Sequence, residues 1–133
     1  MCTFQRDAAL RRILGALDQQ RYGDFEIVVV DNAPEQPGTS GIVERFGRAK
    51  YVPEPKRGTH YARNAGIRRT RGEIVALIDD DRIPHPRWAQ GLLPAGTDAA
   101  GVVRRDHRPD GLPAASAARE APSPSGSGKK LCA

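Results

Sequence analysis

Apolar residues recur every three or four positions near the start of the chain. Within residues 6–20 they stand at Leu10, Ile13, Leu14 and Leu17. This spacing is typical of one face of an α-helix, so the pattern predicts a helix that buries this face. Asp7 comes just before the first apolar residue, where it can cap the helix or place a negative charge in its first turn.

Runs rich in apolar residues predict the strands. Residues 25–30 form a β-branched run and residues 73–78 form the strongest run, and residues 50–53 are predicted as a short strand. Runs without alternation are typical of strands covered on both faces, as in a parallel sheet. A further strand, at the start of the chain, is predicted as a stub that ends near Thr3.

Helical patterns separate these strands. Residues 42–46 indicate a short second helix, residues 59–70 a third, and Pro86 opens a last one. The order is therefore strand, helix, strand, helix, strand, helix, strand. This alternation predicts an α/β domain with a mainly parallel sheet and right-handed crossovers.

The composition changes after residue 93. Residues 94–133 contain no Phe, Tyr, Trp or Ile, and Ala, Gly, Pro and Ser make up 23 of these 40 residues. Such a segment buries too little apolar surface to offset its chain entropy. We therefore expect a structured domain at 1–93 and a low-complexity, disordered tail at 94–133.

The chain of 133 residues carries a formal net charge of +5. A basic balance favours anionic partners such as nucleotide phosphates, nucleic acid or acidic lipid, although scattered arginines also suit a solvated surface. The two cysteines, Cys2 and Cys132, belong to no metal-binding or disulfide pattern, which predicts a reduced, cytoplasmic protein. The longest apolar stretch, residues 74–78, is too short to span a membrane. The N-terminus has no secretory signal pattern.

Polar side chains gather where the predicted strands end. Thr3 and Arg6 follow the first strand, Asp31 and Asn32 end the second, and three aspartates at 79–81 end the fourth. Ligands of parallel α/β sheets bind outside the carboxyl ends of the strands. The predicted topology therefore brings these side chains to one rim, which is a candidate binding site.

The three adjacent aspartates, Asp79, Asp80 and Asp81, are the strongest candidate for a metal site. Their charges repel one another, and a divalent cation relieves that repulsion. Hard oxygen ligands select Mg²⁺ or Mn²⁺, which usually bind together with substrate phosphates. The alternative is an acidic turn that caps the following helix.

Three segments carry a resemblance to a known family. They are VVVDN at 28–32, the segment with ARNAGI at 58–67, and GEIVALIDDD at 72–81. Their order and spacing closely resemble those of the family 2 glycosyltransferases of the GT-A fold, and CTFQRD at 2–7 resembles the end of that family's first strand. The resemblance covers residues 1–93. It implies an enzyme that transfers a sugar from a nucleotide-diphosphate sugar to an acceptor, which could be a glycan, a lipid or a protein.

The resemblance also implies roles for the rim residues on the nucleotide side. Asp31 would bind the base and ribose region, and Thr3 and Arg6 would line the nucleotide pocket. Arg63 would approach the nucleotide or its diphosphate; an arginine near a helix N-terminus can pair with phosphate, and a solvent-facing arginine is the alternative.

On the metal side, Asp79 and Asp81 would form the DxD pair of this family, in contact with ribose and metal. The sequence leaves open whether Asp80 or Asp81 holds the Mg²⁺ or Mn²⁺ ion. The metal would neutralise the charge that builds up on the departing diphosphate.

The sequence departs from the family pattern at both ends. Only Met1 precedes the Cys-Thr position, where the family has several apolar residues, and the resemblance stops near residue 93, before the acceptor half and its catalytic base. No residue is therefore assigned as the base. A truncated or frameshifted remnant that at most binds nucleotide is the alternative to an active enzyme.

Two other classes of protein fit less well. A basic nucleic-acid-binding module is not supported by any helix-turn-helix, zinc or RNP-type pattern, so we expect no nucleic-acid partner. A dinucleotide-binding dehydrogenase would need a GxGxxG segment after its first strand, and none is present.

Overall fold

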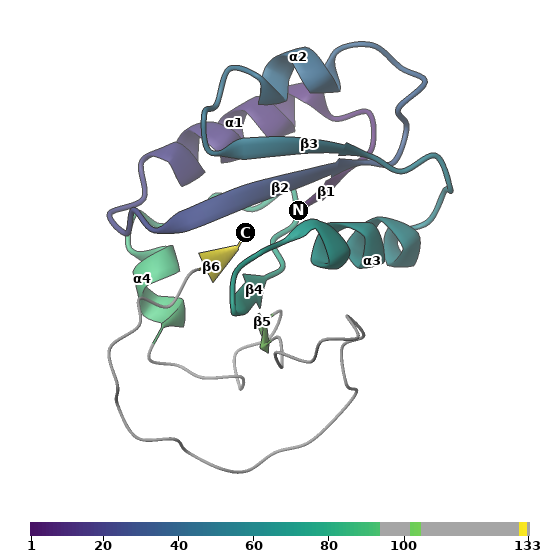
Figure 1. The fold of residues 1–133 in the computed structure, drawn as a ribbon. Coiled ribbons are helices and arrows are strands. Elements are labelled where there is room, and N and C mark those ends of the chain that lie inside the picture. Colours follow the sequence, from purple (N-terminus) through teal and green to yellow (C-terminus); the bar gives the residue numbers. More distant parts are fainter. Residues whose placement is uncertain (94–101, 105–130, 133) are drawn as a thin grey trace.

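The computed structural model describes residues 1–93, 102–104 and 131–132 (Figure 1). The elements follow the predicted α/β alternation. Their bounds are β1 Cys2–Thr3, α1 Asp7–Asp18, β2 Phe25–Asp31, α2 Thr39–Val43, β3 Ala49–Pro53, α3 Thr59–Arg69, β4 Ile74–Ala76, α4 Trp88–Leu92, β5 Val102–Arg104 and β6 Leu131–Cys132.

The sheet is mainly parallel, as predicted. β3 pairs with one edge of β2, and β1 and β6 both pair with the other edge. β4 lies beyond β6 and is parallel to it, and β5 is antiparallel to β4 at the far side. The α/β fold with flanking helices is therefore confirmed.

β2 is buried along its whole length because helices cover both of its faces. Ile27 and Val29 pack in the larger core cluster with the apolar face of α1 and with α2. Val28 and Val30 point the other way and pack with Ala62 of α3. Figure 1 shows this arrangement, with α1 and α2 on one side of β2 and α3 on the other. The unbroken apolar run of β2 is thus explained, since each alternate side chain meets a helix.

The predicted face of α1 is confirmed, because all four apolar residues that define it are fully buried. Arg6 is the N-cap residue and Asp7 is the first helical residue, so the charge of Asp7 lies in the first turn rather than at the cap. None of the helices in the described part of the chain is long and apolar enough to cross a membrane.

β4 is shorter than the predicted strand at 73–78. It pairs only from Ile74 to Ala76, and Leu77 and Ile78 then leave the ladder before Asp79 forms a single parallel bridge with Cys2. β1 is only two residues long, so it does not extend far enough to pair with Leu77 and Ile78. The apolar run predicts burial correctly here, but not pairing.

Two short strands, β5 and β6, lie within residues 94–133, where the sequence predicts no regular structure. Both are joined to β4 through backbone pairing, which composition does not report. The other residues of the predicted disordered tail lie outside the described part of the chain, so the boundary at residue 93 stays a prediction.

Replacing Leu14 by Ala should destabilise the fold, because its side chain is fully buried in the larger core cluster, which also holds residues of β2 and α2. We expect the free energy of unfolding in urea to fall by about 2–5 kcal/mol. The matched control is the next residue of the same helix: a Cβ added at Gly15 meets nothing within 4 Å, so Gly15→Ala should raise stability by about 0.5–1 kcal/mol. Equal losses in both variants would contradict the assigned helix face.

Candidate functional site

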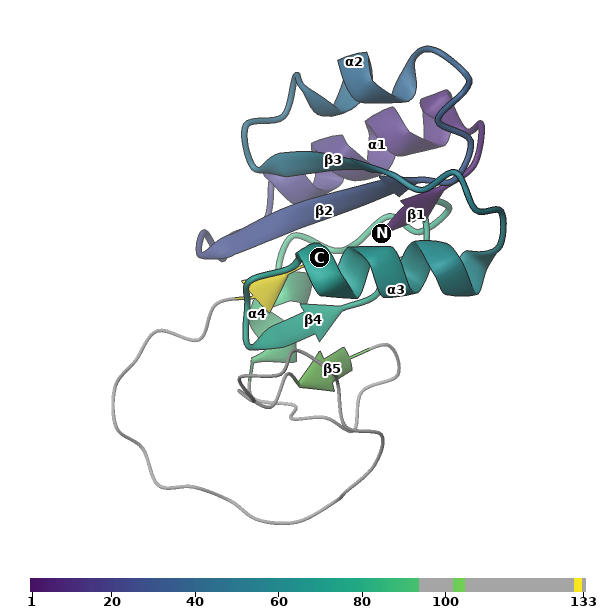
Figure 2. The ribbon, with the colours of Figure 1, turned by 45° about the vertical axis from the view of Figure 1, so that its right-hand side comes forward.

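The carboxyl ends of β1, β2 and β4 lie side by side and form the edge of the sheet at which the parallel strands end. Thr3 pairs in register with Asp31 on β2, and Cys2 bridges to Asp79 beyond β4. Figure 2 shows the end of β1 between the end of β2 and the segment that follows β4. The strand polarity therefore brings the predicted rim residues together, as the sequence suggests.

Asp80 is the buried centre of this edge. Its side chain is only 9% exposed, and both of its carboxylate oxygens are engaged. The hydroxyl of Thr3 donates to Oδ2 at 3.1 Å, and the guanidinium of Arg6 donates to Oδ1 at 3.2 Å. These bonds tie the loop after β4 to β1 and to the turn before α1. Asp80 is thus held in place by the protein itself.

The flanking aspartates are exposed. The side chain of Asp79 is 67% exposed and lies 3.5 Å from Arg63 of α3, and that of Asp81 is 63% exposed and lies 3.7 Å from Arg82. Exposed pairs of this kind contribute little to stability, with a median of about 0–1 kcal/mol. Their oxygens and the Arg63 guanidinium are available to a ligand at modest cost.

Asp31 lies at the same edge, and both of its carboxylate oxygens are engaged, one by the turn after β2 and one by β3. It is 1% exposed. Its Oδ1 accepts from the backbone N–H of Ala33 at 2.9 Å, and its Oδ2 accepts from the hydroxyl of Tyr51 on β3 at 3.1 Å. Burial, followed by the nearby Asp31 charge, raises the pKa of the Tyr51 phenol, which keeps the donor protonated. Tyr51 was not among the predicted site residues.

Asn32 organises the segment that leads into α3. Its amide nitrogen donates to the carbonyls of Glu54 and Lys56 at 2.9 and 2.8 Å, and its oxygen accepts from the N–H of Gly58 at 2.8 Å. Gly58 has a φ of 130°, a conformation that favours glycine, and it directly precedes the helix. The position of Asn32 at a strand end is visible in the sequence, but its long-range partners are not.

The turn between β1 and α1 also carries backbone strain. Gln5 has a φ of 52° although it is not a glycine. Such conformations cost energy and persist where the surrounding structure imposes them. Here the turn joins Thr3 to Arg6, the two residues that hold Asp80.

The edge therefore offers both signs of charge to a ligand. Exposed carboxylates of Asp79 and Asp81 are hard oxygen donors suited to Mg²⁺ or Mn²⁺. The guanidinium groups of Arg6 and Arg63 suit phosphate oxygens. Within the residues that the structure describes, no group of three or more His, Cys, Asp or Glu side chains is placed to hold a metal by itself.

Asp80 and Asp81 should respond differently to truncation. Asp80→Ala leaves Thr3 without its partner inside the fold, and we expect a loss of about 1–3 kcal/mol in the free energy of unfolding. Asp81→Ala removes an exposed side chain, so its effect should stay within about 0.5 kcal/mol. Denaturant melts of the two variants measure this, and a silent Asp80→Ala would refute its anchoring role.

Cys2 provides a second check on this edge. Burial is the largest influence on its thiol and raises its pKa, while the N-terminal ammonium and Arg63 oppose the rise and Asp79 and Asp80 add to it. The thiolate is the reactive form, so iodoacetamide should modify Cys2 more slowly than it modifies a model peptide at pH 8. The measurement uses a Cys132→Ala background, so that only one thiol is followed. A rate equal to that of the peptide would contradict this environment.

Comparisons with known proteins show which family the chain resembles. A family model described as glycosyl transferase family 2 matches residues 1–120. The glycosyltransferase AglE of Haloferax volcanii is 33% identical over 88 residues, covering 61% of this chain and 29% of AglE. Validoxylamine A glucosyltransferase of Streptomyces hygroscopicus subsp. limoneus is 34% identical over 110 residues, covering 76% of this chain and 24% of that protein.

The fold is also found in a solved structure. TarS 1-349 of S. aureus, in complex with UDP, matches with a TM-score of 0.62 at 23% identity, over 68% of this chain and 29% of that one. This likeness shows the GT-A fold alone. The chain spans less than a third of the length of each of these relatives. Because the family model matches most of its length, the chain belongs to glycosyltransferase family 2.

Proposed function

We propose that the chain is the donor-binding part of a glycosyltransferase that takes its sugar from a nucleotide-diphosphate sugar, assisted by Mg²⁺ or Mn²⁺. The observation that carries this proposal is that the three aspartates differ in burial and hydrogen bonding. Asp80 is buried and tied to Thr3 and Arg6, while Asp79 and Asp81 stand exposed on either side of it. Such an arrangement presents two carboxylates on a fixed support.

Asp81 is the better candidate for the metal ligand. The oxygens of Asp80 already accept bonds from Thr3 and Arg6, whereas the ion pair of Asp81 within the described residues is with Arg82 at 3.7 Å. A hard cation suits such an exposed carboxylate and takes further ligands from water and substrate phosphates. When bound, the ion would neutralise the negative charge that develops on the diphosphate leaving group.

Arg63 would bind the nucleotide or its diphosphate. It stands in the N-terminal half of α3, and in the structure it pairs with Asp79 across 3.5 Å. Phosphate oxygens can replace that carboxylate, because exposed ion pairs of this kind are weak. Asp79 is then released toward the ribose, the role that the family resemblance gives it.

Thr3, Arg6 and Asp31 complete the proposed nucleotide site. Thr3 and Arg6 would line the pocket while they hold Asp80. A carboxylate has about four lone-pair positions, and Asp31 uses two of them for Ala33 and Tyr51. Its remaining capacity would serve the base and ribose region.

The transfer reaction itself needs residues beyond those assigned here. Asp98, Asp106 and Asp110 belong to the predicted tail and lie outside the described residues, and none of them is assigned as the catalytic base. The acceptor, whether glycan, lipid or protein, and the cytoplasmic location stay predictions. An inactive remnant is the less favoured alternative, because the relatives that match this region include enzymes named for sugar transfer.

Calorimetry with a panel of nucleoside diphosphates, with and without Mn²⁺, tests the proposal. We expect one of them to bind with an affinity at least about tenfold higher in the presence of the metal, a gain of about 1.4 kcal/mol. Asp81→Ala should remove this dependence on metal. The matched control is Asp18→Ala, which deletes an exposed carboxylate at the far end of α1 and should leave binding unchanged.

Two results would count against this function. Absence of binding by every nucleoside diphosphate in the panel, with the chain shown to be folded, would remove the donor site. Binding that keeps its metal dependence in Asp81→Ala would move the metal to another residue.

A further inference from the structure

The C-terminal strand β6 lies in the middle of the sheet rather than at its edge. Leu131 is in register with Phe25 of β2 on one side and with Ile74 of β4 on the other. Both pairings are parallel. β6 therefore bridges the two longer strands at the end opposite the proposed donor site, and Figure 1 shows it between them.

The register places β6 in line with β1. On β2, Cys2 pairs with Val30 and Leu131 pairs with Phe25, five residues earlier. On β4 and its continuation, Cys2 bridges to Asp79 and Leu131 pairs with Ile74, again five residues earlier. Two independent neighbours thus give the same offset. β6 occupies the course that β1 would follow if it were extended backwards from Met1.

β6 fills the space between the first halves of β2 and β4, which we call the groove. The residues of β2 and β4 are buried. The backbone N–H and C=O groups along the two walls of the groove need partners, because unpaired groups are costly in a buried position. An extended segment parallel to both walls supplies partners to each of them.

Met1 shows that the ladder can continue backwards. Its backbone nitrogen donates to the carbonyl of Val28 at 2.8 Å, and its own carbonyl accepts from Val30 at 2.9 Å. This nitrogen belongs to a terminal ammonium, and Met1 is only 6% exposed. A residue joined before Met1 would keep this donor as an ordinary backbone N–H.

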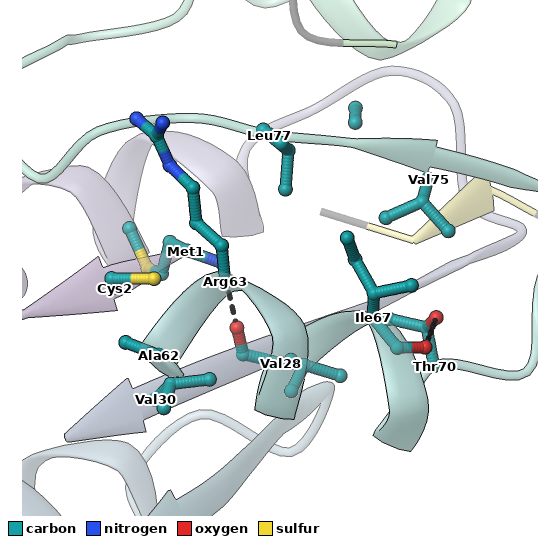
Figure 3. Close-up of a pocket in the computed structure, with 12 residues that line it drawn as sticks. Met1, Cys2, Val28, Val30, Ala62, Arg63, Ile67, Thr70, Val75 and Leu77 are labelled. Atoms are coloured by element: carbon teal, nitrogen blue, oxygen red, sulfur yellow. Dashed lines mark hydrogen bonds between the residues drawn. The ribbon is translucent and has the colours of Figure 1, made fainter. Parts of the chain in front are cut away.

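A small cavity lies between α3 and the sheet. Cys2 and Val30 line it at one end, and Val75 and Ala76 of β4 line it at the other. Figure 3 shows this cavity, with β1 at one end of the view and β6, in yellow, at the other. The register leaves two strand positions between Met1 and Cys132, and the cavity runs past them along the α3 side of the sheet.

We propose that the groove between β2 and β4 is a strand-acceptor site, which the chain fills with its own C-terminal strand β6, and that residues extending β1 backwards would compete with β6 for it. The proposal rests on backbone register and is independent of the proposed donor binding. On this proposal β6 takes the place of a backward extension of β1, and such an extension would displace it.

Hydrogen exchange measured by mass spectrometry tests the docking in the unaltered chain. The amides of Leu131 and Cys132 should exchange at least about tenfold more slowly than in a free peptide of the same sequence, because ladder bonds protect them. Exchange at the rate of the free peptide would overturn the proposal.

A competition experiment tests the site. Four β-branched residues placed before Met1 reach the position of Leu131, and in this variant the amides of Leu131 and Cys132 should lose their protection. An extension of the same length made of Gly and Ser is the control and should leave them protected. Deleting residues 131–133 should lower the urea midpoint of the unaltered chain but not that of the β-branched variant. Protection of β6 alongside the β-branched extension, or additive effects of extension and deletion, would show that the two segments do not share one site.

Discussion

The two-residue strand β1 is the constraint on which the rest of the structure depends. It pairs with β2 through Cys2 and Thr3, and it meets the segment after β4 through the bridge from Cys2 to Asp79. Thr3 then donates to Asp80, so one short strand joins the half of the sheet around β2 to the half around β4 at the proposed donor edge. Loss of this contact would separate Asp80 from its support even if both halves stayed folded.

The three aspartates show how one acidic run serves two purposes. Asp80 accepts hydrogen bonds within the protein, whereas the exposed carboxylates of Asp79 and Asp81 are available to a ligand. The chain turns at this run, where the backbone N–H of Arg82 donates to the carbonyl of Asp79 at 3.2 Å. Within the turn the middle carboxylate is buried and hydrogen-bonded while the outer two reach solvent, which explains how a like-charged run is tolerated beside a buried core.

Much of the fold could be predicted from the sequence because it depends on local periodicity. The stripe of α1 and the apolar run of β2 report burial on one face and on two faces, and both predictions are confirmed. The partners of Asp31 and Asn32 could not be predicted, since Tyr51 and Gly58 lie about twenty or more residues away and come close only through the sheet register. β6 was missed for the same reason: a two-residue strand has no periodicity, and only its neighbours make it a strand.

The placement of β6 also has a consequence for the order of folding. Its partners on β2 lie more than a hundred residues earlier in the chain. Closing such a loop costs conformational entropy before the new ladder bonds can stabilise the structure. Contacts between α1, β2 and β3 join much nearer neighbours and should form first. β6 would then dock late and leave early, so the first step of unfolding would open the middle of the sheet rather than one of its edges.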